Sequence, residues 1–577
     1  MDSCDKFAAM KKSAIVFAVL VIAASAFAQR EHQDRPTPSG GPLEYQQAAF
    51  DVLSYDITAT VNPATKSISG TTIMEARIVA PTRWITIDLD TPYTISSVRV
   101  WKNDAFKPAH FRREAGEIHI EFESSKQPGE IFQTSITYTG KPRVAPNPPW
   151  VGGFMWEKTG DGSDWVVIAC QNDGADLWFP IKDHPSDEPD SVSLHITVPE
   201  NLYVATVGKL VKNTANDDGT RTFDWHMSNP INNYNVVLNI APYRLVEDKY
   251  KSVGGEEFPI IFYALPESVE KARDIVDQTK EFLAFYEKFA GPYPFRAEKL
   301  GIAETPHLGM EHSTIIAYGN KFRKGADGFD GLMLHELGHE WWGNMVTASD
   351  WRDMWLHEGF QSYFDSLFLE QTKGHEAYLK AMRTKMRNTN NVQALAPREP
   401  RFAYQIYFQP PDYVKSDGDI YGKGASVLHT LRYLIGDSAF FRSLRRMAYP
   451  AKSLESVTDG KQNRLVTTDD FKQIAEEESG MELDWFFEVY FRQPKLPRLA
   501  ISQYSDKIVV KWVTPREMPF PMPVDVVIDG KTQRIEMKHG EVTLRWRGKN
   551  RPGIDMEGWV LRDPVDMIND PYEKYNQ

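Results

Sequence analysis

Apolar and polar residues alternate in short runs through residues 45–246, and turn residues separate the runs. Residues 55–61 (Tyr-Asp-Ile-Thr-Ala-Thr-Val) and 117–122 (Glu-Ile-His-Ile-Glu-Phe) show the pattern clearly. A period of two places successive side chains on opposite faces of a strand, so that one face can be buried. The pattern therefore predicts an N-terminal antiparallel β domain.

A helical period follows the strand-like residues 258–263. Residues 269–289 carry apolar side chains at helical spacing, and similar patterns continue to about residue 493. They include residues 425–435 and residues 467–477, which open with Thr-Thr-Asp-Asp, a signal for a helix N-terminus. We predict a mainly helical domain in this part of the chain.

Alternation returns after the proline-bounded residues 494–497, in residues 507–512 and 524–528, and it predicts a small β-sandwich at the end of the chain. A chain of 577 residues is too long for a single core. The predicted fold class is multidomain α+β. The predicted domains are an N-terminal β domain (29–246), a mainly helical domain (247–495) and the β-sandwich (496–577).

The first 28 residues have the pattern of a secretory signal peptide. Met10-Lys11-Lys12 precedes the apolar residues 14–24, and Ala26-Phe27-Ala28 offers a cleavage site. We expect translation to start at Met10 and residues 1–28 to be removed, which makes the protein exported, either periplasmic or secreted. The apolar run is shorter than the roughly 20 residues of a spanning helix, so no stable membrane span is expected after cleavage. An uncleaved membrane anchor is the alternative.

Charge and cysteine content exclude two classes of protein. The formal net charge is −13, and loss of residues 1–28 brings it to −14. An acidic protein without a basic run does not attract nucleic acid, which we exclude as a partner. Loss of Cys4 leaves only Cys170, so an intramolecular disulfide framework is excluded. Cys170 fits a buried small apolar side chain better than a catalytic thiol.

His335-Glu336-Leu337-Gly338-His339, followed by Glu358, forms the most specific pattern in the chain. Residues i and i+4 lie above one another on a helix, so the two imidazoles can bind one metal ion. Glu336 lies one step round the helix, where it can deprotonate a water molecule held by the metal. The alternative is two hydrogen-bonded core histidines and a surface acid.

The residues around the motif favour one helix for residues 335–339 and a second helix for Glu358. An apolar stripe at helical spacing accompanies the first half, and Gly343-Asn344 supplies a stop. A second helical pattern runs over residues 357–372, with Glu358 in its first turn. The stripe consists of Leu332, Leu334, Leu337 and Trp341.

Further along, Gly309-Met310-Glu311-His312 precedes the motif, Tyr421-Gly422-Lys423-Gly424 follows it, and Gln171 lies in the β domain. Taken singly, each has an ordinary reading as a loop acid, a half-buried aromatic residue or a surface amide. Together, Gly-Met-Glu, His-Glu-x-x-His-Glu-Trp-Trp-Gly-Asn, Trp-Leu-x-Glu-Gly-Phe and Tyr-x-Lys-Gly resemble the gluzincin aminopeptidases related to aminopeptidase N. The resemblance extends through residues 286–289 and 291–295.

This resemblance implies an N-terminal β domain, a thermolysin-like zinc catalytic domain and a β-sandwich, in a short form that lacks the helical C-terminal domain of the family. It implies that His335, His339 and Glu358 bind one Zn²⁺ per chain. Glu336 would be the general base, and Tyr421 would donate its hydroxyl to the oxyanion, a contact worth about 3 kcal/mol.

The resemblance also places residues at the amine end of a peptide substrate. Glu311 would bind the free α-ammonium group, with Gln171 assisting. Gly309 and Met310 would pair with the peptide backbone as an added strand. The implied function is a zinc aminopeptidase (EC 3.4.11 type) that acts on peptides with a free N-terminus.

Three more residues bear on this site. Asp365 lies two turns after Glu358, where its carboxylate can accept the outward N–H of a ligand imidazole, although a solvated surface position is the alternative. The family has Asn where this chain has His312 and His357. Both departures affect the surroundings of the site and the orientation of the ammonium group, and either histidine is an alternative metal contact.

Other functions remain open at this point. One is a zinc hydrolase of the same fold with another specificity, either an endopeptidase or an enzyme resembling an epoxide hydrolase. Another is a non-catalytic peptide-binding protein. The sequence does not define the preferred N-terminal side chain, the maximum peptide length or the oligomeric state, although a missing helical domain favours longer peptides.

Overall fold

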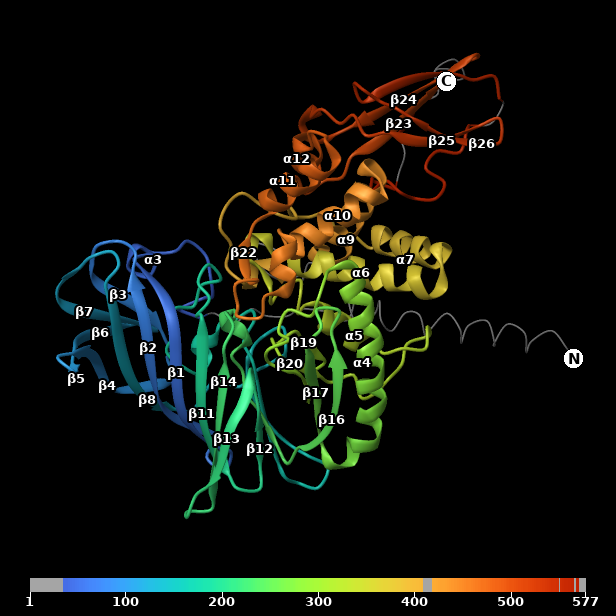
Figure 1. Cartoon of the computed structure of the whole chain (residues 1–577). Helices are drawn as coiled ribbons and strands as arrows, with labels where there is room; N and C mark the ends of the chain where they lie inside the picture. The colour runs from blue at the N-terminus through green and yellow to red at the C-terminus, as the bar shows by residue number, and fades with distance from the viewer. Residues whose placement is uncertain (1–34, 408–417, 549–550, 565–566, 570–577) are drawn as a thin grey trace, which may run out of the picture.

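The computed structural model describes residues 35–407, 418–548, 551–564 and 567–569. The predicted signal peptide, residues 1–28, lies outside these residues. Figure 1 shows the β strands of the N-terminal domain beside a second, smaller sheet, with helices at one end of both and a further group of strands at the far end. None of the described helices combines the length and apolar character needed to cross a bilayer.

The N-terminal domain is built from three sheets. The eight-stranded sheet has the order β13-β14-β11-β1-β2-β8-β4-β5, and the two smaller sheets have the orders β12-β15-β10-β9 and β3-β7-β6. Its elements are α3 (Tyr45–Ala48), β1 (Phe50–Asn62), β2 (Ser67–Ile78), β3 (Thr82–Asp88), β4 (Tyr93–Lys102), β5 (Ala105–Pro108), β6 (His110–Glu114), β7 (Glu117–Lys126), β8 (Ile131–Gly140), β9 (Gly153–Lys158), β10 (Asp164–Ala169), η1 (Ala175–Leu177), β11 (Ser191–Pro199), β12 (Tyr203–Ala205), β13 (Lys209–Ala215), β14 (Thr220–Met227), η2 (Asn233–Asn235) and β15 (Asn239–Ala241).

The predicted strands at residues 55–61 and 117–122 lie within β1 and β7, but a purely antiparallel domain is wrong. β1 pairs with β11 in parallel, with Ser54 opposite Ser191 and Thr60 opposite Thr197. Parallel neighbours need a long connection, and here the strands β2 to β10 lie in the chain between β1 and β11. Alternation within single strands does not report which distant strand becomes the neighbour.

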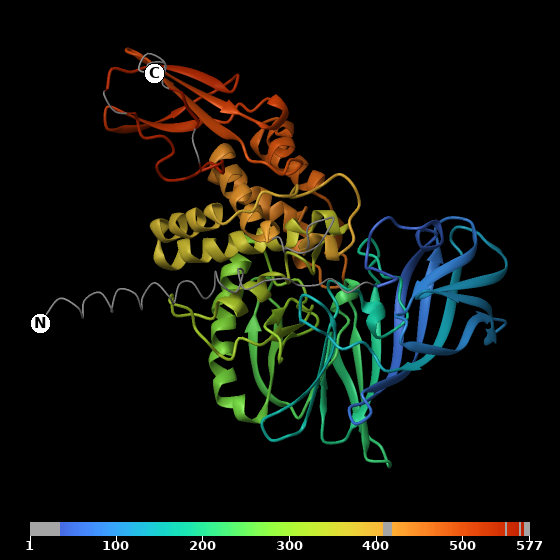
Figure 2. The ribbon, with the colours of Figure 1, turned by 180° about the vertical axis from the view of Figure 1, so that it is seen from behind.

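The second domain opens with a mixed sheet of order β16-β17-β18-β20-β19. β17, β18 and β20 are parallel, whereas β16 and β19 pair antiparallel at the two edges. β16 begins three residues before residue 247, the boundary predicted from the sequence. The predicted helix at residues 269–289 is confirmed as α4, which covers this sheet (Figure 2). These elements are β16 (Arg244–Lys251), β17 (Glu257–Ala264), η3 (Pro266–Ser268), α4 (Val269–Phe289), β18 (Leu300–Glu304), β19 (Gly309–Met310) and β20 (Ile315–Tyr318).

Helices dominate the rest of this domain, as predicted. The predicted N-terminal signal at Thr467 is a capping box, in which Thr467 and Asp470 bond each other's backbone N–H. The elements are α5 (Gly331–Gly338), β21 (Val346–Ala348), η4 (Trp351–Asp353), α6 (Trp355–Lys373), α7 (His375–Arg387), α8 (Tyr404–Tyr407), α9 (Asp419–Ile435), α10 (Asp437–Ala448), η5 (Lys452–Ser456), β22 (Arg464–Val466), α11 (Thr468–Ser479) and α12 (Asp484–Tyr490).

α5 ends earlier than its sequence pattern indicates. The stop was expected at Gly343-Asn344, but the helix ends at Gly338, and His339 is its C-cap. Beyond it the turns widen, because Asn344 N–H donates to His339 O (2.9 Å) and later N–H groups repeat this five-residue spacing. His339 keeps right-handed helical angles, so the i, i+4 relation to His335 survives.

The end of the described chain is again β structure. The predicted strand at residues 524–528 is confirmed as β25, and the one at 507–512 as β24. One sheet has the order β27-β24-β23-β28, and β25 pairs with β26. The sandwich arrangement stays a prediction. The elements are β23 (Arg498–Gln503), β24 (Lys507–Val513), η6 (Pro515–Glu517), β25 (Val524–Ile528), β26 (Lys531–Ile535), β27 (Glu541–Arg545) and β28 (Met567–Asn569).

Residues 35–41, which we call the N-terminal strap, join the first two domains. Arg35 and Thr37 both donate to Asp176 Oδ2, at 2.5 and 3.1 Å, in the N-terminal domain. Further along the strap, Gly41 N–H donates to Arg401 O, and Ser39 O accepts from Ala403 N–H. The strap therefore holds η1 and the segment before α8 at the same time.

The Arg35–Asp176 ion pair gives a first prediction. Both side chains are almost wholly buried, so Arg35→Met leaves an uncompensated carboxylate in the interior. We expect the free energy of unfolding of the N-terminal domain to fall by about 3–5 kcal/mol, measured by denaturant titration. Arg77→Met is the control, because Arg77 pairs with Asp51 at the surface, and it should cost less than about 1 kcal/mol. Equal losses in the two variants would contradict the assignment.

Candidate functional site

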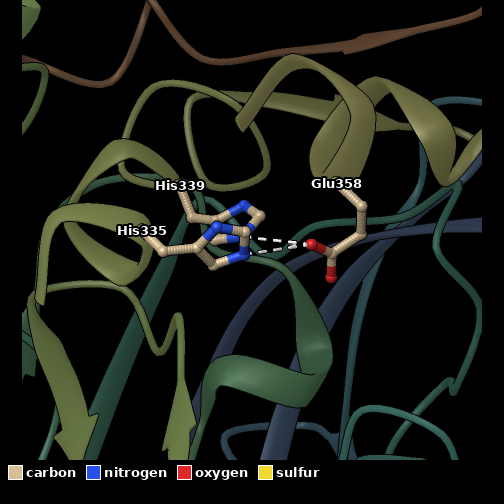
Figure 3. A group of neighbouring side chains, drawn as sticks. All are labelled: His335, His339 and Glu358. Carbon is tan, nitrogen blue, oxygen red and sulfur yellow. Dashed lines mark hydrogen bonds and ion pairs between the residues drawn. The ribbon is translucent and has the colours of Figure 1, made fainter. Parts of the chain in front are cut away.

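Three side chains from two helices converge on one point (Figure 3). His335 Nε2 and His339 Nε2 lie 3.3 Å apart, and Glu358 Oε2 lies 3.4 Å from each. The histidines belong to α5 and its C-cap, and Glu358 lies in the first turn of α6. Among the His, Cys, Asp and Glu side chains of the described residues, these three form a cluster that could hold a metal ion.

The spacing of these atoms fits zinc. Zn²⁺ binds imidazole nitrogen and carboxylate oxygen at about 2.0–2.2 Å in tetrahedral geometry, which puts two ligand atoms about 3.4 Å apart. The observed separations of 3.3 and 3.4 Å match this value. Two neutral imidazoles and one carboxylate, with a fourth position left for water, are also the ligand set of catalytic rather than structural zinc sites.

Hydrogen bonds on the far side of each ring aim the Nε2 atoms inward. His335 Nδ1 lies 3.0 Å from Asp365 Oδ2, and His339 Nδ1 lies 2.8 Å from Trp342 O. Both acceptors require the proton on Nδ1, which leaves Nε2 free for a metal. The predicted contact between Asp365 and a ligand imidazole is confirmed.

Burial and charge shift the ionisation of the site in opposite directions. Burial lowers the pKa of His339, but the carboxylate of Glu358 outweighs it and raises that pKa to about 9. Burial raises the pKa of Glu358, but the two imidazoles outweigh it and the pKa is lowered. Burial also raises the pKa of Glu336 to about 8. Without a metal, a protonated imidazole therefore pairs with the ionised Glu358 carboxylate. A metal cation can take the place of the proton.

Tyr421 reaches the site from α9. Its ring lies over that of His335, with the centroids 6.3 Å apart and the planes at 26°. The helices α6 and α9 approach closely here, because Gly359 follows Glu358 and faces Gly424. A Cβ atom on Gly424 would lie 2.8 Å from Gly359 Cα, so only glycine permits this spacing.

Glu311 is held by the N-terminal domain. Its Oε1 accepts hydrogen bonds from Gln171 Nε2 (2.5 Å) and from Tyr234 OH (2.9 Å). Asn344 Nδ2 fixes the backbone of Glu311 by donating to its carbonyl oxygen at 2.8 Å. Burial raises the pKa of the Glu311 carboxyl. Asn344, which binds the Glu311 backbone, also donates its own N–H to His339 O, so Glu311 lies close to the candidate metal ligands.

Gly309 and Met310 form β19, the edge strand of the mixed sheet. An edge strand has unpaired backbone groups that can bind a peptide as an added strand. A Cβ atom on Gly309 would lie 2.6 Å from Glu336 Oε1, so the base candidate faces this strand directly. The structure thus brings together every residue that the sequence assigned to the site.

His312 and His357 do not join the ligand group. His312 is fully buried, and burial lowers its pKa well below the usual range. His357 Nε2 accepts a hydrogen bond from Ala348 N–H at 2.9 Å, which ties the start of α6 to β21. The alternative in which these histidines contact the metal therefore has no support in the geometry.

Three functional-site residues were missed from the sequence. Tyr234 and Asn344 bind Glu311, and the hydroxyl of Tyr407 lies 3.3 Å from both Gln171 Oε1 and Tyr421 OH. Tyr234 lies in the polar run Asn-Asn-Tyr-Asn of an otherwise alternating domain, which is a usable signal. Tyr407 has no comparable signal, because its partners lie far away in the chain.

Comparison with known families agrees with this geometry. Residues 52–234 match the peptidase M1 N-terminal domain, and residues 275–490 match the peptidase family M1 domain. The chain is 24% identical over 412 residues to glutamyl aminopeptidase of Homo sapiens, covering 68% of this chain and 40% of that protein. It is 28% identical over 232 residues to aminopeptidase N of Streptomyces lividans, covering 37% and 26%. The chain thus spans less than half the length of these relatives.

The fold also has solved counterparts. The crystal structure of an M1 zinc metallopeptidase from Deinococcus radiodurans superposes with a TM-score of 0.62 at 22% identity. The superposition covers 80% of this chain and 96% of that one, so the likeness extends over several domains.

Asp365 gives a prediction about the metal. Asp365→Asn keeps the shape of the side chain but weakens the hydrogen bond that orients His335, and we expect zinc affinity to fall about 10- to 100-fold. The measurement is competition with a chromophoric chelator. Glu370→Gln is the matched control, because Glu370 lies on the same helix but pairs with Arg432. The assignment fails if both variants bind zinc as the unmodified protein does.

Proposed function

The chain belongs to the M1 peptidase family, and on that premise we propose that it is a zinc-dependent aminopeptidase that removes the N-terminal residue of peptides. The observation that carries the proposal is the buried carboxylate of Glu311 beside the His335–His339–Glu358 group. Gln171 and Tyr234 are neutral donors that do not compensate the charge of the buried Glu311 carboxylate, and the α-ammonium group of a peptide would supply the positive partner.

In this proposal the three ligands hold one Zn²⁺ per chain. When bound, zinc supplies Lewis acidity that polarises the scissile carbonyl group and lowers the pKa of a water molecule. Glu336 accepts the proton of that water, as its position between the two histidines and beside β19 supports. Tyr421 donates its hydroxyl to the negative charge that develops on the carbonyl oxygen.

Glu311 sets where the peptide is cut. An ammonium group bound to its free oxygen fixes the first residue of the peptide, and β19 fixes the direction of the backbone. A substrate without a free amine would leave the buried carboxylate of Glu311 desolvated and unpaired, which disfavours internal cleavage. We also propose that the protein is exported, because residues 1–28 have the pattern of a signal peptide.

Glu336→Gln tests the role of the base. The amide cannot accept a proton, so we expect kcat to fall at least about 100-fold while the zinc content stays at one per chain. Zinc is measured by atomic spectroscopy and turnover with a chromogenic aminoacyl substrate. Glu281→Gln, on the exposed face of α4, is the control and should leave kcat unchanged. Retained hydrolysis by zinc-loaded Glu336→Gln would overturn the mechanism.

Glu311 tests the function itself. A panel of chromogenic aminoacyl substrates should be hydrolysed with zinc, not with chelator, and not after N-acetylation. Glu311→Gln should raise KM for the free-amine substrates about 30-fold or more, because it removes one partner of a charged pair. Equal hydrolysis of acetylated and free substrates would favour an endopeptidase or another zinc hydrolase. Zinc binding without hydrolysis of any substrate would favour a non-catalytic binding protein.

A further inference from the structure

Tyr407 lies between the two ends of the site. It is the last residue of α8, and its side chain is buried, with 5% of the residue exposed. Its hydroxyl lies 3.3 Å from Gln171 Oε1 and 3.3 Å from Tyr421 OH. One side chain therefore contacts both a residue of the amine end and the proposed donor to the oxyanion.

The chemistry of these groups fixes the direction of each hydrogen bond. Gln171 Nε2 donates to the Glu311 carboxylate, so its amide oxygen faces Tyr407 and can only accept. Tyr407 has one hydroxyl proton, which this bond uses. In the contact between the two tyrosines, Tyr421 is then the donor. A directed chain runs from Tyr421 through Tyr407 and Gln171 to Glu311.

The two links made by Tyr407 are weak enough to change during a reaction. Hydroxyl donors usually lie about 2.7–2.8 Å from their acceptors, and 3.3 Å is well beyond that distance. Tyr421 can therefore turn its proton from Tyr407 toward an arriving carbonyl oxygen at little cost. The amide of Gln171 keeps its orientation meanwhile, because Tyr407 still donates to its oxygen.

Backbone contacts keep Tyr407 in place. Ile406 O accepts a hydrogen bond from Gln393 Nε2 at 3.2 Å, and Ala403 N–H donates to Ser39 in the N-terminal strap. The same strap binds Asp176, five residues after Gln171. The strap thus holds the two segments whose side chains meet in the Tyr407–Gln171 contact.

We propose that Tyr407 is a positioning residue that couples recognition of the substrate's ammonium group to the placement of the Tyr421 hydroxyl. It orients Gln171 toward Glu311 and gives Tyr421 an acceptor before substrate arrives. The inference rests on the proposed aminopeptidase function of this site. A merely buried tyrosine would contribute to stability, whereas a coupling residue changes both KM and kcat.

Tyr407→Phe removes the hydroxyl and keeps the ring. We expect kcat/KM for a free-amine aminoacyl substrate to fall about tenfold. KM should rise because Gln171 is less well oriented, and kcat should fall because the Tyr421 hydroxyl is less well placed. Tyr490→Phe is the matched control, because that hydroxyl is also buried and donates to Leu561 O, away from the site. It should lower thermal stability and leave both kinetic parameters unchanged.

Double variants test the coupling. In a Tyr421→Phe background, Tyr407→Phe should lower kcat less than about twofold, because the partner that it positions is already gone. In a Gln171→Ala background, its effect on KM should shrink in the same way. If the effects of the single variants simply multiply, or if Tyr407→Phe changes neither parameter, the proposal is overturned.

A binding measurement separates this inference from the proposed function. L-leucinamide and its des-amino counterpart, 4-methylpentanamide, are titrated by calorimetry into the zinc-loaded protein with and without Tyr407→Phe, both in a Glu336→Gln background so that the amide is not hydrolysed. Tyr407→Phe should weaken L-leucinamide at least about threefold and leave 4-methylpentanamide unchanged, even if the unmodified protein hydrolyses no peptide. Equal affinities with and without Tyr407→Phe would overturn the role of Tyr407, whatever the outcome of the activity assays.

Discussion

The packing of the second domain depends on bringing two imidazoles and one carboxylate within 3.4 Å of one another. Ionisable groups in the interior are unfavourable unless each is paired. The outward nitrogens of the histidines are therefore satisfied by Asp365 and by Trp342 O. Two glycines, Gly359 and Gly424, let α6 and α9 approach until Tyr421 reaches the same place. The metal centre is thus a property of helix packing as much as of the short motif.

The proposed amine end of the site depends on the junction between the first two domains. Glu311 belongs to the catalytic domain, but two of its side-chain partners, Gln171 and Tyr234, come from the N-terminal domain. Asn344, just beyond the second histidine ligand, holds its backbone. The N-terminal domain is therefore part of the site itself. The second domain alone would keep the candidate metal ligands. It would lose Gln171 and Tyr234, which both donate to Oε1 of Glu311.

The sequence predicts the parts of this site that local geometry determines. The spacing of His335 and His339, the helix that carries Glu358 and the position of Asp365 all follow from the helical period, and the structure places them accordingly. The pairing of β1 with β11 and the contacts of Tyr407 depend on segments far apart in the chain, so no local period reports them. α5 ends at Gly338, before the predicted stop, because N–H groups from residue 344 onward bond carbonyls five residues back, which the apolar period does not report.

Charge links the three candidate metal ligands to Glu336, the proposed base. Without a cation, the charge of Glu358 outweighs burial and raises the pKa of His339 to about 9, while burial raises the pKa of Glu336 to about 8, so both groups hold a proton at neutral pH. A dication that replaces the protons on the ligands also lowers the pKa of the nearby carboxyl group by direct attraction. Glu336 would then be ionised and able to accept a proton. In the proposed mechanism, the burial that raises the pKa of Glu336 would also strengthen it as a proton acceptor once a metal is bound, because few water molecules solvate its charge.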